Sequence, residues 1–219
     1  MNYAQIAKEA RIKVLELIYK AQTSHIGSNF SCIDILTVLF EKIDLDKDRF
    51  VLSKGWAAAS LYYFLWRKGR ITEEELNSYC QPGSKFIGLA EPVVPEIPIS
   101  GGSMGLGLPG AVGIALAKKL KGEEGKVYCL MSDGEMQIGT TWESAMIAAH
   151  HDLNNLVVIV DNNYLQAMGK TEDILNVGGD LEEHRFDDRG LNNKWESFEW
   201  AVVISHGHNY KEIEERIDY

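Results

Sequence analysis

The chain has 219 residues, of which 45% are hydrophobic and 25% charged, enough for one α/β domain with a sizeable core. Its formal net charge is −10 and it has no run rich in Lys and Arg, which argues against nucleic acid or an anionic membrane as its main partner. No signal peptide or stretch long enough to span a bilayer is evident. Three cysteines without CxxC spacing, Cys32, Cys80 and Cys129, suit a reducing compartment. We therefore expect a cytoplasmic protein that acts on small molecules.

The order of predicted elements is that of a single α/β domain spanning residues 1–219. Periodicity and capping signals predict helices over residues 2–21, 31–41, 57–68, 107–121, 140–151 and 210–217, and a further helix that starts at a capping box in residues 72–75. Short apolar runs predict strands over residues 50–53, 127–131, 156–160 and 200–204. Residues 81–100 hold four of the five prolines and should form a long loop, a feature that is often functional. His206 and His208 follow the last predicted strand and should lie in a surface loop.

The strands over residues 127–131 and 156–160 carry the main chemical signal. The helix between them makes a strand–helix–strand unit, so the two strands should be parallel, in an open sheet with helices on both faces. Ligands bind beyond the carboxyl ends of such strands, where Asp133-Gly134 and Asn162-Asn163 follow. A carboxylate, an amide oxygen and a glycine that admits close backbone approach suit a divalent cation holding a phosphate.

These two turns, at this separation, resemble the thiamine diphosphate signature, a Gly-Asp-Gly turn followed about thirty residues later by paired Asn. The flanking text narrows the resemblance to the N-terminal section of transketolase. It includes the segments 48–55 (DRFVLSKG), 102–107 (GSMGLG) and 171–173 (TED). The resemblance runs from the first helix almost to Tyr219 and implies a thiamine diphosphate-binding fold.

The resemblance also assigns roles by position. It implies that Asp133, Asn163 and the backbone carbonyl of Leu165 ligate Mg²⁺ or Ca²⁺, and that the Gly134 amide donates to the diphosphate. Further family positions are Gly102 and Met104 at the aminopyrimidine ring, His25 facing the reacting carbon and Glu143 at the subunit interface.

Simpler interpretations exist for some of these residues. An Asp-Gly after a strand is often only a turn. Thr140 and Glu143 have the spacing of a capping box, so capping and interface roles both stay open for Glu143. The glycines between residues 102 and 107 could serve close packing alone.

Four positions depart from the family pattern. Ser132 replaces a glycine, Trp56 and Leu89 replace two histidines, and Ile138 replaces an interface glutamate. The chain is also about fifty residues shorter than the family section. Metal and diphosphate binding should therefore be retained, whereas proton transfer and sugar-phosphate handling should be altered, since imidazoles are common acid–base groups.

The resemblance implies the N-terminal subunit of a two-component transketolase-like enzyme, which transfers a two-carbon ketol unit from a ketose or keto acid to an acceptor, in a specialised biosynthetic pathway. It needs a separate C-terminal subunit that carries the pyrimidine domain. We expect a dimer of this chain flanked by two partners, a heterotetramer, with residues 136–149 as a candidate apolar contact surface. An α-keto acid decarboxylating component and a non-catalytic structural or regulatory paralog are the alternatives.

Overall fold

The computed structural model describes residues 2–176 and 189–217. Its main sheet has three parallel strands in the order β1-β2-β3, namely β1 (Arg49–Leu52), β2 (Val127–Ser132) and β3 (Leu156–Asp161). The predicted parallel pairing is therefore confirmed, with Cys129 opposite both Val51 and Val158. A small antiparallel ribbon, β4 (Leu165–Gln166) and β5 (Gly169–Lys170), follows β3.

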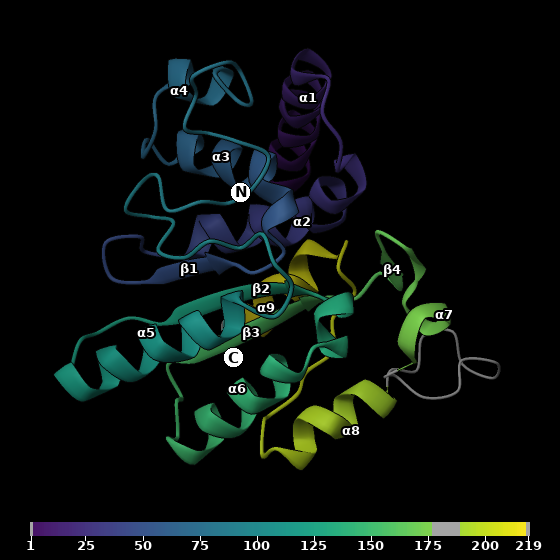
Figure 1. The fold of residues 1–219 in the computed structure, drawn as a ribbon. Helices are drawn as coiled ribbons and strands as arrows, with labels where there is room; N and C mark the ends of the chain where they lie inside the picture. The colour runs from purple at the N-terminus through teal and green to yellow at the C-terminus, as the bar shows by residue number, and fades with distance from the viewer. Residues whose placement is uncertain (1, 177–188, 218–219) are drawn as a thin grey trace.

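Helices cover both faces of the sheet, as Figure 1 shows. One face carries α1 (Tyr3–Ala21), α2 (Ile26–Lys42), α3 (Ala58–Arg67) and α9 (Tyr210–Ile217). The other face carries α5 (Gly107–Lys121), α6 (Gly139–His150) and α8 (Arg189–Ser197). Short helices are η1 (Gly55–Ala57), α4 (Glu73–Asn77), η2 (Asp133–Gln137) and α7 (Thr171–Leu175).

Alternation along the strands separates the two cores. Phe50, Leu52 and Leu130 point into the core beneath α1, α2 and α3, while Val51 and Cys129 point into the core beneath α5 and α6. All are nearly fully buried, because a parallel sheet is covered on both faces. No described helix is both long and apolar enough to cross a membrane.

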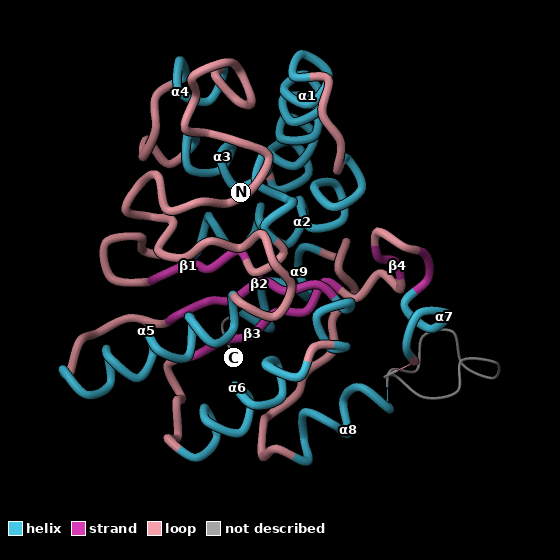
Figure 2. Tube along the Cα trace, in the orientation of Figure 1, coloured by secondary structure: helices cyan, strands magenta, loops and turns pink. Residues whose placement is uncertain are grey.

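Two predicted elements differ from the structure. Residues 200–204 form no strand, because no neighbouring strand bonds with them in the described ranges; Figure 2 draws them as loop. Their apolar character is used differently: the Trp200 indole donates to the Ala145 carbonyl at 3.0 Å, and Val202 packs against the core. The second helix begins at Ile26 rather than near Ser31. The irregular segment between the first two helices ends at His25, whose backbone is in the left-handed region.

Candidate thiamine diphosphate and metal site

The carboxyl ends of β2 and β3 lie side by side, and both predicted turns sit there. Ser132, the last residue of β2, pairs in register with Asp161, the last residue of β3. Asp133 therefore leaves the sheet next to the segment that contains Asn163. Parallel pairing thus places next to each other two turns that are about thirty residues apart in sequence.

The carboxylate of Asp133 is buried, and only one of its two oxygens is hydrogen-bonded. The side chain is almost fully buried, and Oδ1 accepts the Gly134 amide at 2.8 Å. The other oxygen, Oδ2, is buried and has no hydrogen-bond partner. Burial raises the pKa of Asp133 to about 6, although the backbone amides of Gly134 and Tyr164 favour the charged form. A buried oxygen without a partner is costly, so this one is available for a cation.

Asn163 and Leu165 approach the same place from the β3 side. The Asn163 Oδ1 atom accepts the Leu165 amide at 3.0 Å, and its Nδ2 atom faces Asp161 Oδ1 at 3.5 Å. Leu165 is itself exposed, in β4. The carboxamide of Asn163 is therefore held at both ends.

The glycine-rich segment lies over the Asp133 turn. A Cβ atom built on Gly134 would lie 3.7 Å from Met104 Sδ and 3.4 Å from Gln166 Cβ. A Cβ atom on Gly102 would lie 3.1 Å from the Leu89 side chain. Gly102, Met104 and Gly134 are therefore gathered around one region, and Leu89, which replaces a family histidine, borders it.

Three distant segments are joined there by a closed ring of backbone hydrogen bonds. Gly55 N donates to Gly101 O at 2.6 Å, Gly101 N to Ala90 O at 2.9 Å, and Ala90 N to Gly55 O at 3.1 Å. A Cβ atom on Gly55 would lie 2.0 Å from Gly101 O, so only glycine fits at that position. This backbone ring fixes the long 81–100 loop, as predicted without helix or strand, against the end of β1.

His25 and Trp56 form an aromatic pair. Their ring centroids lie 4.3 Å apart, with the planes inclined by 33°. Trp56 is 41% exposed, so it is not a core residue. Burial lowers the pKa of His25, which favours the neutral imidazole.

The capping interpretation of Glu143 is wrong. Helix α6 starts at Gly139 and has no side-chain cap, because the Thr140 hydroxyl instead donates to Gly105 O at 2.7 Å. The capping box forms earlier, between Ser132 and Glu135. Glu143 is exposed on α6.

The predicted apolar surface over residues 136–149 is also smaller than expected. Met136 is fully buried, and Trp142 stacks on Trp195 and Phe198 at 5.4 and 5.7 Å. Only Met146 and Ile147 are exposed large apolar residues in that range. Sequence alone did not show that α8 would cover Trp142.

Two buried charged groups at this edge were not predicted. Glu135 accepts hydrogen bonds from the Ser53 hydroxyl, from Gly105 N at 3.1 Å and from Ser132 N at 2.9 Å. The Ser-x-x-Glu spacing of Ser132 and Glu135 could have predicted the capping box, but nothing in the sequence indicates the contact between Glu135 and Ser53. Lys54 forms an ion pair with Asp161. The only hint of this in the sequence is that a lysine directly follows a predicted strand.

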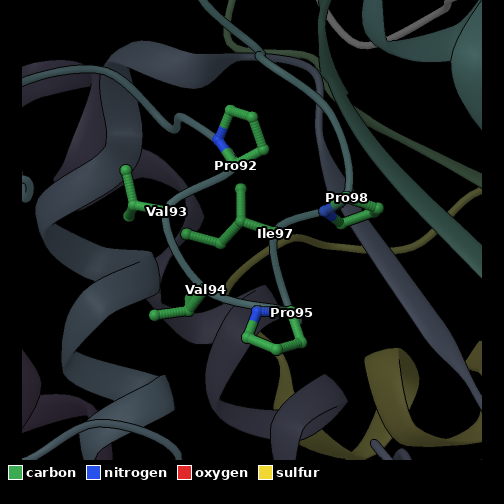
Figure 3. A pocket seen from close by; sticks show the side chains of 6 residues that line it. All are labelled: Pro92, Val93, Val94, Pro95, Ile97 and Pro98. Atoms are coloured by element: carbon green, nitrogen blue, oxygen red, sulfur yellow. The ribbon is translucent and has the colours of Figure 1, made fainter.

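A pocket of about 400 Å³ lies elsewhere in the 81–100 loop, shown in Figure 3. Its lining is uncharged and consists of Pro92, Val93, Val94, Pro95, Ile97 and Pro98. None of these residues belongs to the predicted site, and such a lining offers nothing to a diphosphate.

The donor set fits a magnesium or calcium diphosphate complex. In the described ranges no group of three His, Cys, Asp or Glu side chains could hold a metal unaided. The predicted set instead combines one carboxylate with an amide and a carbonyl oxygen, which are ligands that hard cations accept. The unpartnered Asp133 oxygen supports this fit. Fold and site together define an α/β protein with a candidate diphosphate site at the carboxyl ends of parallel strands.

Comparison with known proteins gives the family. Residues 3–219 match the family model described as transketolase, thiamine diphosphate binding domain, so the chain belongs to the transketolase family. It is a component of a thiamine diphosphate-dependent, transketolase-like transferase.

Relatives and a solved structure support this assignment. One relative is an apulose-4-phosphate transketolase subunit of Phocaeicola vulgatus, which is 33% identical over 216 residues, covering 94% of this chain and 73% of the relative. The 6-deoxy-6-sulfo-D-fructose transketolase subunit SqwG of Clostridium sp. strain MSTE9 is 33% identical over 217 residues, covering 94% and 75%. Transketolase from Campylobacter jejuni matches with a TM-score of 0.87 at 29% identity, covering 100% of this chain and 35% of that one.

Proposed function

We propose that this chain is the thiamine diphosphate- and Mg²⁺-binding subunit of a two-component transketolase, and that residues 1–219 act as one diphosphate-binding domain. The single observation that carries the proposal is the buried, unpartnered Asp133 oxygen at the carboxyl end of β2. Asp133, Asn163 and the Leu165 carbonyl would hold the metal, and the Gly134 amide would turn to the diphosphate. When bound, thiamine diphosphate supplies the carbanion that accepts and passes on a two-carbon ketol unit.

The side chains around the site suggest an unusual sugar substrate. Trp56 and Leu89 stand where the resembled family has histidines, which makes the entrance more apolar and removes acid–base groups. The neutral His25, stacked on Trp56, remains to exchange protons with the substrate. The named relatives act on apulose-4-phosphate and on 6-deoxy-6-sulfo-D-fructose. We propose a ketose of such a specialised pathway as the donor.

Assembly with a second subunit follows from the same surface. The names of the relatives describe them as subunits, and segments that form the site carry exposed apolar residues: Ile26, Trp56, Met104, Leu106 and Leu165. We propose that a chain with the pyrimidine domain covers this rim. Glu143, Met146 and Ile147 share one exposed face of α6 and would form the contact between two copies, giving a heterotetramer. Three free cysteines suit a cytoplasmic location.

Reconstitution tests the proposal. The chain should bind thiamine diphosphate in a Mg²⁺-dependent manner by calorimetry, with ketol transfer appearing only after the pyrimidine-domain partner is added. Asp133→Ala should remove both signals, while Asp152→Ala, in the turn after α6, should remove neither. Transfer by the isolated chain, or cofactor binding that ignores Asp133, would contradict the proposal.

A further inference from the structure

Lys54 is a buried cation at the carboxyl end of β1. It is 7% exposed, its ammonium group pairs with the Asp161 carboxylate, and it donates to Ser31 Oγ at 3.1 Å. The Ser31 hydroxyl donates to the same Asp161 oxygen at 2.6 Å. A buried charge is costly unless it is paired and hydrogen-bonded, and each of these groups is satisfied by the others.

Asp161 connects this buried pair to a predicted metal ligand. Its Oδ2 atom receives Lys54 and Ser31, which leaves Oδ1 to face the Asn163 amide nitrogen at 3.5 Å. An amide whose nitrogen is held in this way presents its oxygen on the opposite side. Asp161 therefore helps to orient the Asn163 carboxamide, together with the Leu165 amide that donates to its Oδ1 at 3.0 Å.

The charge on Lys54 matters as much as its hydrogen bonds. Burial disfavours the ammonium form, but the carboxylates of Asp161 and Asp133 raise the pKa of Lys54. Asp133 and Asp161 are both acidic groups at an edge that would receive a negatively charged diphosphate. Without Lys54, Asp161 would place an uncompensated negative charge near the bound diphosphate.

We infer that Lys54 is a positioning residue for the cofactor: by neutralising Asp161 it lets that carboxylate orient Asn163 as a metal ligand without repelling the diphosphate. This inference rests on the proposed function and assigns Lys54 no direct contact with metal or cofactor. Outer-sphere partners of metal ligands commonly affect metal affinity by about 10–100-fold.

The test is calorimetric titration of the full chain with thiamine diphosphate at saturating Mg²⁺. Lys54→Met should weaken binding by about 10–100-fold. Lys118→Met is the matched control, because Lys118 is also buried, at 5% exposure, but donates to Lys47 O at 3.0 Å instead. It should lower thermal stability while leaving cofactor affinity as in the wild type.

The double variant Lys54→Met/Asp161→Asn separates positioning from direct contact. Removing both charges should restore part of the affinity lost in Lys54→Met, yet leave it below that of the wild type. If Lys54 touched the diphosphate itself, the double variant would bind no better than the single one, which would overturn the inference.

The remaining outcomes are also decisive. Wild-type affinity in Lys54→Met would overturn the inference while the proposed function stands. Absence of binding by the wild-type chain, with and without its partner, would overturn both. If Lys54→Met does not fold, Lys54→Gln and Lys54→Gln/Asp161→Asn replace the pair: higher affinity in the double variant than in Lys54→Gln supports positioning, and no gain refutes it.

Discussion

The imidazole of His25 stacks on the indole of Trp56 with ring centroids 4.3 Å apart. His25 sits in the left-handed backbone region just before α2, and Trp56 lies in η1, directly after Gly55 of the backbone ring. Two elements at the carboxyl end of β1 thus present one aromatic surface. Its volume limits what can reach His25.

Trp56→His should raise kcat/KM for ordinary phosphorylated ketoses, measured with the reconstituted enzyme. The smaller, polar ring frees volume and returns an acid–base group next to His25. Trp66→His, ten residues further along in α3, is the control and should leave the substrate preference unchanged. Equal effects of the two substitutions would show that Trp56 does not select the substrate.

Asp133→Ala should reduce Mg²⁺-dependent cofactor affinity severely, since it removes the carboxylate of the predicted ligand set. Asn163→Ala should act in the same direction but more weakly, because it removes a neutral ligand. Circular dichroism should show an intact fold in both variants, as both residues lie beyond strand ends. Undiminished cofactor binding by Asp133→Ala would contradict the proposed site.

Asp34 predicts acid sensitivity of the fold. The residue is only 3% exposed. Its carboxylate accepts hydrogen bonds from the Arg11 guanidinium at 2.8 and 2.7 Å, from His208 Nδ1 at 2.6 Å and from the Tyr210 hydroxyl at 2.9 Å. Burial alone would raise the pKa of Asp34, but the bonds from Arg11, His208 and Tyr210 outweigh it and lower the pKa below 3.8. His208, expected only as a surface loop residue, thus fastens the C-terminal segment to α2.

Because the folded pKa is lowered, the stability from Asp34 is present above the unfolded value and is lost as pH falls through the folded one. Asp34→Asn should therefore cost about 3–5 kcal/mol in urea unfolding at pH 7, and the difference should shrink below pH 3.8. Glu124→Gln breaks the exposed Lys47 pair and should leave the melting temperature unchanged. A pH-independent effect of Asp34→Asn would contradict the assignment.

Gly101→Ala should destabilise the chain by about 3 kcal/mol, since the new Cβ atom would lie 1.9 Å from Leu52 O, a backbone atom that cannot move aside. Gly113→Ala, in the exposed part of α5 with nothing within 4 Å, should instead stabilise it by about 0.5–1 kcal/mol. Urea titration of both variants gives the comparison. Similar values with the same sign would show that the backbone ring tolerates a side chain.

Met146→Lys/Ile147→Lys should convert a self-associated chain to a monomer in light scattering, because two charges replace the exposed apolar residues of α6. Leu120→Lys, at a site on α5 that is 78% exposed, is the control and should keep the mass of the wild type. A monomeric wild type that also ignores a pyrimidine-domain partner would count against the two-subunit proposal.

The sequence predicted the local parts of this fold well. The long loop, the capping box at Thr72 and the strands before Asp133 and Asn163 all depend on neighbours in the chain, and the structure confirms them. Residues 200–204 were misassigned because their apolar pattern does not say whether a strand partner exists. The predicted ligand set itself remains to be tested by the variants above.

Contacts between distant segments were beyond sequence reasoning. Lys54 and Asp161 are separated by 107 positions, and nothing local indicates that both become buried and paired. The same holds for Ser53 and Glu135, 82 positions apart. Such pairs depend on the place of β1 beside β2, which no local pattern of this sequence indicates.

The backbone ring also bears on how such enzymes acquire new substrates. Each ring residue is next in sequence to a residue at the entrance of the site. Trp56 follows Gly55, Leu89 precedes Ala90, and Gly102 follows Gly101. The ring itself uses only main-chain atoms, so the neighbouring side chains can be exchanged while its hydrogen bonds persist. Substrate preference can therefore diverge by single replacements at positions 56 and 89, and a family can diversify without rebuilding the frame that holds the cofactor.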